Sequence, residues 1–245
     1  MKRGFFLLLL LWPLLLAAQQ PVLRVGYFYL PPHGYLQDGE PAGYALQYFQ
    51  RLAQLMGVQP SYRQEPLSRL LQDRQLDMVL YLAGSAERRR QLQFASRPLL
   101  LMRGVLVVRQ QSSYREIRVA EQLQDMRIGI WADGYLSPLL ASRRSQLDAM
   151  SGDDVLERSL QKLTLGRIDA FYSPEPYAVR EVLRRRGGQE QFRLLPLPEQ
   201  PVGLYAAFTE RGRRHLPRYE QALDAAQREQ SYADYLQLQL GAAPG

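Results

Sequence analysis

LDMVLYLAGSAERRRQLQFASRP, residues 76–98, joins an almost wholly apolar segment to a short, strongly basic one. The first part, residues 76–83, has the length and composition of a strand that is buried on both faces of a sheet. Ser85 can then cap a helix that carries three consecutive arginines, Arg88–Arg90. Such a run indicates either a polyanion partner, or one arginine that binds a small anion beside two that face solvent.

Strands and helices alternate on both sides of this stretch. Before it, 21–32 is predicted to be a short buried strand that runs into a Pro-rich turn, and a second strand is predicted at 58–64. Helices are predicted at 43–57 and 66–75. After it, strands are predicted at 104–108, 127–134 and 167–173, and helices at 135–147, 153–166, 177–188, 217–230 and 231–241. Repeated units of this kind predict an α/β protein whose buried sheets are largely parallel.

Two of these units share a pattern. In SRLLQDRQLDMVLY and SLQKLTLGRIDAFYS, a helix, a short bend, an apolar residue and an aspartate precede the strand. Asp77 and Asp169 are the matching acids. The pattern indicates either a duplicated lobe or a coincidence between common units, and in both cases two similar α/β lobes. Asp153 and Asp154 are predicted to cap the helix of the second unit.

The first residues, MKRGFFLLLLLWPLLLAAQQ, have the regions of a secretory signal. Two basic residues are followed by an apolar core, Phe5–Leu16, that is shorter than the about 20 residues needed to span a bilayer. The alternative is an uncleaved membrane anchor, since Leu16 stands where a small residue is preferred for cleavage. We expect residues 1–18 to be a signal peptide and the mature protein to be periplasmic.

The composition of the 245 residues excludes several kinds of site. The chain has no cysteine, which excludes disulfides, thiolate metal sites, cysteine nucleophiles and a lipoprotein anchor. The formal net charge of +7 falls to +5 without the signal residues Lys2 and Arg3, a modest excess that does not require nucleic acid. The two histidines, His33 and His215, form no metal-binding or catalytic motif. We expect no metal, no cofactor and no nucleic-acid partner.

Six segments follow one another in a distinctive order: LRVGYFYLPP, GEPAGYALQYFQRLAQLMG, LLQDRQLDMVLYLAGSAERRRQLQFASRPL, LQDMRIGIWADG, LQKLTLGRIDAFYS and VGLYAAFTERGRRHLPRYEQAL. In this order and spacing they resemble the bacterial extracellular solute-binding proteins of family 3, the periplasmic binding proteins for polar amino acids. The resemblance covers nearly the whole mature chain. It depends on the ordered set, since no single segment is highly specific.

This resemblance implies a type II, periplasmic-binding-protein-like α/β fold with two lobes and two crossing hinge strands. The crossings are expected near 104–109 and 202–208. The first part of lobe 1 would then be 19–109 and lobe 2 would be 110–201, with a return strand and the C-terminal helices of lobe 1 in 202–245. Closure of the lobes would bury a small solute between them.

The resemblance also implies an arginine that binds the ligand carboxylate, six residues before a phenylalanine. That phenylalanine is Phe94, so the arginine is Arg88, whose planar, permanently charged guanidinium suits a carboxylate. The structural alternative is an exposed salt-bridge residue. Ala83 occupies the position, five residues before the arginine, where family members carry a hydroxyl.

In lobe 2 the implied pattern is less complete. Tyr135 follows a turn glycine where the family often has threonine, and Pro174 replaces the aspartate that accepts the ligand amino group. Glu175 is the next residue and can supply that charge, or it is an exposed loop glutamate. The expected aromatic and apolar cleft positions are Tyr29, Leu30, Tyr81 and Tyr172.

The implied function is a periplasmic solute-binding protein that captures a small carboxylate, expected to be an amino acid, for an ABC-type importer. We expect a monomer, no enzymatic activity, and an ABC permease in the inner membrane as partner. Two alternatives stay open. One is an enzyme of the cyclohexadienyl-dehydratase kind with Glu175 as general acid. The other is an orphan sensory receptor that signals to a membrane partner without a permease.

Overall fold

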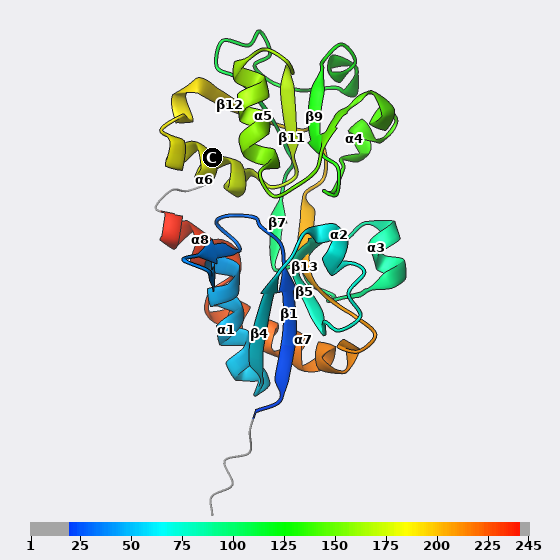
Figure 1. The fold of residues 1–245 in the computed structure, drawn as a ribbon, viewed down its shortest axis with the longest axis vertical. Coiled ribbons are helices and arrows are strands. Elements are labelled where there is room, and N and C mark those ends of the chain that lie inside the picture. Colours follow the sequence, from blue (N-terminus) through cyan, green and yellow to red (C-terminus); the bar gives the residue numbers. More distant parts are fainter. Residues whose placement is uncertain (1–19, 241–245) are drawn as a thin grey trace, which may run out of the picture.

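The computed structural model describes residues 20–240, so the predicted signal peptide at 1–18 lies outside the described residues. The chain forms two α/β lobes stacked along the long axis of the molecule, with extended segments running between them (Figure 1). The predicted α/β class and the two lobes are confirmed. Within 20–240, no helix has the length and apolar character required to cross a membrane.

Lobe 1 is built on a sheet with the strand order β4-β1-β5-β13-β6, and β7 also pairs with β13. The strands are β1 Val22–Tyr27, β4 Gln59–Gln64, β5 Met78–Ala83, β6 Gln93–Phe94, β7 Leu100–Met102 and β13 Val202–Phe208. β1 runs parallel to β4 and β5, whereas β13 is antiparallel to β5. Every residue of β5 is buried, as expected for the apolar run at 76–83.

The helices of lobe 1 lie on both sides of this sheet (Figure 1). They are α1 Tyr44–Met56, α2 Leu67–Leu70, α3 Ala86–Gln91, α7 Leu216–Glu229 and α8 Tyr232–Leu240, and a small hairpin is formed by β2 Tyr35–Gln37 and β3 Glu40–Ala42. α1 packs against α7 and α8. It ends at Gly57, whose φ of 66° is left-handed and whose N–H reaches back to the last-turn carbonyls, so the predicted glycine C-cap is confirmed.

Lobe 2 has a five-stranded sheet with the order β10-β9-β11-β8-β12. Its elements are β8 Val105–Arg109, β9 Ile128–Trp131, β10 Asp148–Met150, β11 Ala170–Ser173, β12 Phe192–Pro196, α4 Pro138–Ala141, α5 Val155–Thr164 and α6 Pro176–Arg186. β9, β10 and β11 are parallel, and β8 and β12 are antiparallel to their neighbours. Two apolar clusters form its core.

Two predictions for the helices of lobe 2 are wrong in detail. The helix expected at 135–147 has only one α-helical turn, α4, and a 3-10 turn over Arg144–Gln146, because the chain must already be extended for β10. Asp154 is the N-terminal flanking residue of α5, but its side chain makes no capping hydrogen bond. It pairs instead with Arg158, one turn further on, at 2.9 Å.

The chain passes between the lobes twice, from β7 to β8 and from β12 to β13. β8, which the sequence boundaries assigned to lobe 1 within 19–109, pairs with β11 and β12 and therefore belongs to the sheet of lobe 2. The first crossing is thus confined to Arg103 and Gly104. At Gly104 an added Cβ would lie 2.6 Å from the carboxylate of Glu199 on the second crossing, so the two segments approach closely.

The sequence pattern around Asp77 and Asp169 corresponds to the same local structure in both lobes. Asp77 accepts a hydrogen bond from the backbone N–H of Arg24 at 2.8 Å, and its own N–H donates to the Arg24 carbonyl. Asp169 makes the same pair of contacts with Arg127, at 2.9 and 2.8 Å. Each aspartate thereby joins the start of one strand to its parallel neighbour, which supports the interpretation of a repeated unit.

Candidate ligand-binding cleft between the lobes

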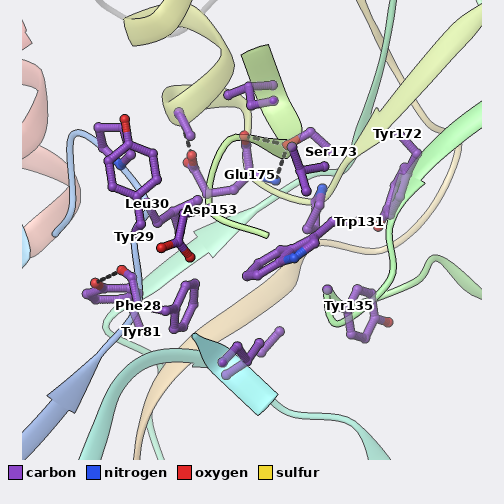
Figure 2. A pocket seen from close by; sticks show the side chains of 18 of the residues that line it. Phe28, Tyr29, Leu30, Tyr81, Trp131, Tyr135, Asp153, Tyr172, Ser173 and Glu175 are labelled. Atoms are coloured by element: carbon purple, nitrogen blue, oxygen red, sulfur yellow. Dashed lines mark hydrogen bonds between the residues drawn. The ribbon is translucent and has the colours of Figure 1, made fainter. Parts of the chain in front are cut away.

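A cavity of about 870 Å³, including its open mouth, lies between the lobes. All eight residues that the sequence analysis placed at the site line its wall: Tyr29, Leu30, Tyr81, Ala83, Arg88, Tyr135, Tyr172 and Glu175. Figure 2 shows that the labelled aromatic side chains surround the cavity from both lobes. A largely apolar cavity with a few convergent polar groups is the usual form of a small-molecule site.

Aromatic rings from both lobes form a prominent part of the wall. Phe28, at the end of β1, lies with its ring centroid 5.5 Å from that of Trp131 at the end of β9, so the two rings meet across the lobes. Neither residue was predicted from the sequence. Their positions at the carboxyl ends of parallel strands, where ligand sites of open α/β sheets lie, were the available signal.

Tyr81 supports the wall without offering its hydroxyl to the cavity. It is fully buried, and its hydroxyl donates to the carbonyl of Phe28 at 2.6 Å. Its φ of 41° is left-handed, which is unusual for a bulky residue, and the pairing of β5 with β13 shifts register beside it. This bulge aims the ring behind Phe28.

Arg88 lies on α3 at the junction of the two lobes. Ser85 caps this helix, as predicted, by accepting the N–H of Arg88 at 3.2 Å. The guanidinium donates to the carbonyl of Ala83 at 3.0 Å and to that of Asp133, in lobe 2, at 2.7 Å. Burial lowers the pKa of Arg88, yet an arginine keeps its charge. The alternative of an exposed salt-bridge arginine is wrong, since neither partner is an acid.

The other two arginines of the run differ from Arg88. Arg89 and Arg90 are both exposed. The guanidinium of Arg89 stacks over the ring of Phe94, 4.6 Å from its centroid, and over Tyr205 at 5.2 Å. Arg89 is therefore a packing residue of the lobe 1 surface as well as a charge.

Glu175 lines the cavity but is committed to other partners. It is only 2% exposed, so the alternative of an exposed loop glutamate is wrong. Its carboxylate caps α6, accepting the N–H of Tyr177 at 2.9 Å and that of Ala178. Oε1 also lies 3.3 Å from Nε2 of His33 in lobe 1, a close contact that is not aligned as a hydrogen bond.

His33 extends this contact into lobe 1. It is fully buried, and its Nδ1 lies 2.7 Å from the hydroxyl of Tyr232 on α8. The chain Tyr232–His33–Glu175 therefore connects the C-terminal helix of lobe 1 to the start of α6 in lobe 2. It was not predicted, because the three residues are far apart in the sequence.

Tyr172 and Tyr135 lie on the hinge side of the cavity. Tyr172 is 1% exposed, and burial together with the nearby Glu199 raises its pKa. Glu199 contacts the hydroxyl of Ser137, and its own pKa is raised by burial. Tyr135 is half-buried, and burial and Glu199 raise its pKa as well. Polar groups from β11, from the start of α4 and from the second crossing segment thus meet at the hinge.

Two acids on the lobe 2 side were missed as cleft residues. Asp153 and Glu157 flank the start of α5 and line the cavity. The sequence analysis assigned Asp153 to helix capping; the position of α5 directly after β10, at the cleft end of the sheet, was the signal that it faces the site. Burial, with Asp154 and Glu65 nearby, raises the pKa of Asp153. Within residues 20–240, no group of three or more potential ligands could hold a metal ion.

The family model for bacterial extracellular solute-binding proteins, family 3, matches residues 23–237, and the chain belongs to this family. No curated protein matches it. Its fold is similar to a histidine kinase sensor domain with similarity to periplasmic binding proteins, at a TM-score of 0.74 and 19% identity, covering 87% of this chain and 93% of that one.

The fold of this chain is also similar to the folds of two solved binding proteins. One is an ABC uptake transporter substrate-binding protein from Streptococcus pneumoniae with bound histidine (TM-score 0.75, 14% identity, 90% of this chain and 93% of that one). The other is an ancestral arginine-binding protein bound to arginine (TM-score 0.74, 16% identity, 90% and 98%). The type II, periplasmic-binding-protein-like fold expected from the sequence is thereby confirmed.

Proposed function

We propose that this protein captures a small carboxylate-bearing solute, an amino acid, in the cleft between its lobes and presents it to an ABC-type importer. The observation that carries the proposal is the position of Arg88. Its half-buried guanidinium lines an aromatic cavity and contacts both lobes through the carbonyls of Ala83 and Asp133. The histidine and arginine bound by the two similar binding proteins support an amino acid as the ligand class.

The chemistry follows from the guanidinium and its surroundings. A planar fork of N–H donors binds a carboxylate in a bidentate manner, and the interaction is stronger where water is excluded. Ser85 and the start of α3 hold the Arg88 backbone, so little freedom is lost on binding. The aromatic wall, led by Phe28 and Trp131, covers the apolar part of the solute.

Closure of the lobes is the expected response to the solute. A ligand that contacts both lobes binds the closed state better than the open one and so shifts the equilibrium toward closure. The contacts of Arg88 with Asp133 and of His33 with Glu175 both cross between the lobes and would form in the closed state. A closed binding protein of this kind is what an importer recognises, in the periplasm where the N-terminal sequence directs the chain.

The dehydratase-like alternative requires a protonated carboxylic acid that faces the substrate. Glu175 was its candidate, but both oxygens of this carboxylate accept helix N–H groups, so they are already committed to capping α6. The enzyme therefore has weaker support than the binding protein, and we propose that the protein acts without catalysis, as a monomer.

A second candidate is a sensory receptor. The observation that favours it is the similar fold of a histidine kinase sensor domain. In such a role the same cleft would bind the same class of solute, and the closed form would act on a membrane partner other than a permease.

Thermal shift and calorimetry on the purified protein, with the twenty amino acids and a set of simple carboxylates, test the proposal. We expect stabilisation by one or a few amino acids, and loss of that binding in Arg88→Ala. Arg90→Ala is the matched control, since it removes an exposed charge from the same helix. Binding that is equally strong in Arg88→Ala would refute the assigned site, and turnover of a carboxylic acid that stops in Glu175→Gln would favour the enzyme.

A further inference from the structure

The start of α5 brings two carboxylates to the lobe 2 side of the cavity. Asp153 lies in the turn before the helix and Glu157 in the first turn of the helix, and both line the cavity together with Tyr29 of lobe 1. Burial raises the pKa of Tyr29, and Glu157 and Asp153 both add to this increase. Figure 2 shows Asp153 directed into the space between Tyr29 and Trp131.

Neither acid has a cationic partner in the part of the chain that the structure describes. The ion pairs within 20–240 include neighbouring acids of the same segment, such as Asp154 with Arg158, but not Asp153 or Glu157. The Oε2 atom of Glu157 is buried and accepts no hydrogen bond in that part of the chain. Glu157 is half-buried and Asp153 is exposed. A buried oxygen without a partner, such as Oε2 of Glu157, is costly, and a solute group that reaches it would satisfy it.

Two other arginines act on Tyr29 but do not line the cavity. Arg185 and Arg186 both act on the hydroxyl of Tyr29, lowering its pKa, but neither lines the cavity. Arg185 pairs with Glu181 at 2.7 Å and stacks over the ring of Tyr35 at 5.1 Å. Arg88 is thus the cationic side chain among those that line the cavity, and it faces two unpaired acids.

Donors without partners complement these acceptors. The indole Nε1 of Trp131 is buried and, within 20–240, has no acceptor. The cavity therefore combines the unpaired donor of Trp131 and the charged guanidinium of Arg88, which is hydrogen-bonded to backbone carbonyls, with two carboxylates that have no ion pair in the described residues. A solute that meets both sets needs an anionic group and a cationic group. With Glu175 included, the cavity wall holds three carboxylates against one arginine, a formal excess of two negative charges.

We propose that Asp153 and Glu157 bind positively charged groups of the solute, so that the preferred ligand is an amino acid with a basic side chain. This inference rests on the proposed function, because it takes the solute carboxylate to be bound by Arg88. An α-ammonium group and a side-chain ammonium or guanidinium would neutralise both acids. Aromatic faces such as Phe28 and Trp131 also favour a cation between them.

Isothermal titration of the protein with L-lysine, L-arginine, L-glutamine and L-glutamate tests the inference. The two basic amino acids should bind most tightly. Asp153→Asn and Glu157→Gln should each weaken their binding by about 10- to 100-fold, as expected when a charged hydrogen bond is lost. Asp154→Asn is the matched control, because this adjacent acid is paired with Arg158 and lies outside the cavity wall. Melting of each ligand-free variant checks that the fold is kept.

The outcomes separate this inference from the proposed function. If glutamine or glutamate binds most tightly, requires Arg88, and is unaffected by Asp153→Asn, the binding function stands and the inference is overturned. If a basic amino acid requires Asp153 but not Arg88, the acidic wall is supported and the carboxylate clamp is wrong. If none of the four amino acids binds, the inference is overturned, while binding of another carboxylate that requires Arg88 would preserve the broader function.

Discussion

The two lobes share a folding unit but present opposite chemistry to the cleft. Each contains parallel strands tied at their start by one aspartate, Asp77 in lobe 1 and Asp169 in lobe 2. At the other end of the strands, lobe 1 contributes the cationic Arg88, whereas lobe 2 contributes the acids Asp153 and Glu157. Neither lobe alone is complementary to a zwitterionic solute, and this explains why binding would require closure.

The lobes also differ in how deeply the shared aspartate is buried. Asp77 is 1% exposed and forms an ion pair with Arg211 at 3.0 Å. Asp169 pairs with Arg127 through two hydrogen bonds but is partly open to solvent. The equivalent aspartate is therefore a core residue in one lobe and a partly exposed residue in the other. Substitutions there should lower the free energy of unfolding by different amounts in the two lobes.

The largest effect is expected from the aspartate of lobe 1. Asp77→Ala should lower the free energy of unfolding by about 2–3 kcal/mol, because it removes the buried carboxylate that accepts from the Arg24 N–H and from the exposed guanidinium of Arg211. Asp169→Ala should cost about 1 kcal/mol, the value for exposed hydrogen bonds. Urea denaturation of both variants measures the difference. Equal losses would show that the two units do not differ in the way the burial indicates.

The contact between the lobes at His33 should have an intermediate effect. Glu175→Ala removes the cap of α6 and the partner of His33, and should cost about 1–2 kcal/mol of stability. It should also favour the open form, which small-angle scattering would detect as a larger radius of gyration in the presence of ligand. Glu190→Ala, an exposed acid of the same lobe, is the control and should stay within about 0.5 kcal/mol of the wild type.

The pH dependence of stability should differ between the wild type and Asp169→Asn. The guanidinium of Arg127 lowers the pKa of Asp169, so its contribution to stability is present above the ordinary pKa of an aspartate and is lost as the pH falls through the lowered value. The wild type should therefore exceed Asp169→Asn in stability at pH 6, and this difference should shrink as the pH falls below about 4. A difference that grows on acidification would contradict the assigned ion pair.

The smallest effect is expected within the arginine run. Arg89→Ala should cost about 0.5 kcal/mol of stability through the lost stacking on Phe94 and Tyr205. Arg90→Ala should change the stability by less, because the structure gives it no such contact in the described residues. Thermal melting of the two variants, each with the solute-binding cleft unchanged, provides the comparison.

Much of the architecture could be predicted from the sequence because it depends on local patterns. The apolar run at 76–83 predicted β5, and Gly57 and Gly187 marked the ends of α1 and α6, both in left-handed conformation. The strand and the two glycine caps depend on residues close together in the chain, where hydrophobic period and capping chemistry act directly. The assignment of Arg88 came instead from the family resemblance, which implied an arginine six residues before Phe94.

The remaining features depend on contacts between distant segments. The partner of Glu175 is His33, and the capping role of this glutamate became evident only with the position of α6. Asp153 and Asp154 are adjacent in the sequence, yet one faces the cavity and the other pairs with Arg158. Side-chain direction at a helix start depends on how the helix packs, so no local pattern separates two neighbouring acids.

The central claim is that the two lobes hold opposite ends of one solute, and a titration with L-lysine and cadaverine tests it most directly. Cadaverine is lysine without its carboxylate, so it can meet the acids of lobe 2 but not Arg88. Lysine should bind the wild type more tightly than cadaverine does, and Arg88→Ala should abolish this difference, while Asp153→Asn should weaken both ligands. If Arg88→Ala leaves the preference for lysine unchanged, the claim is contradicted.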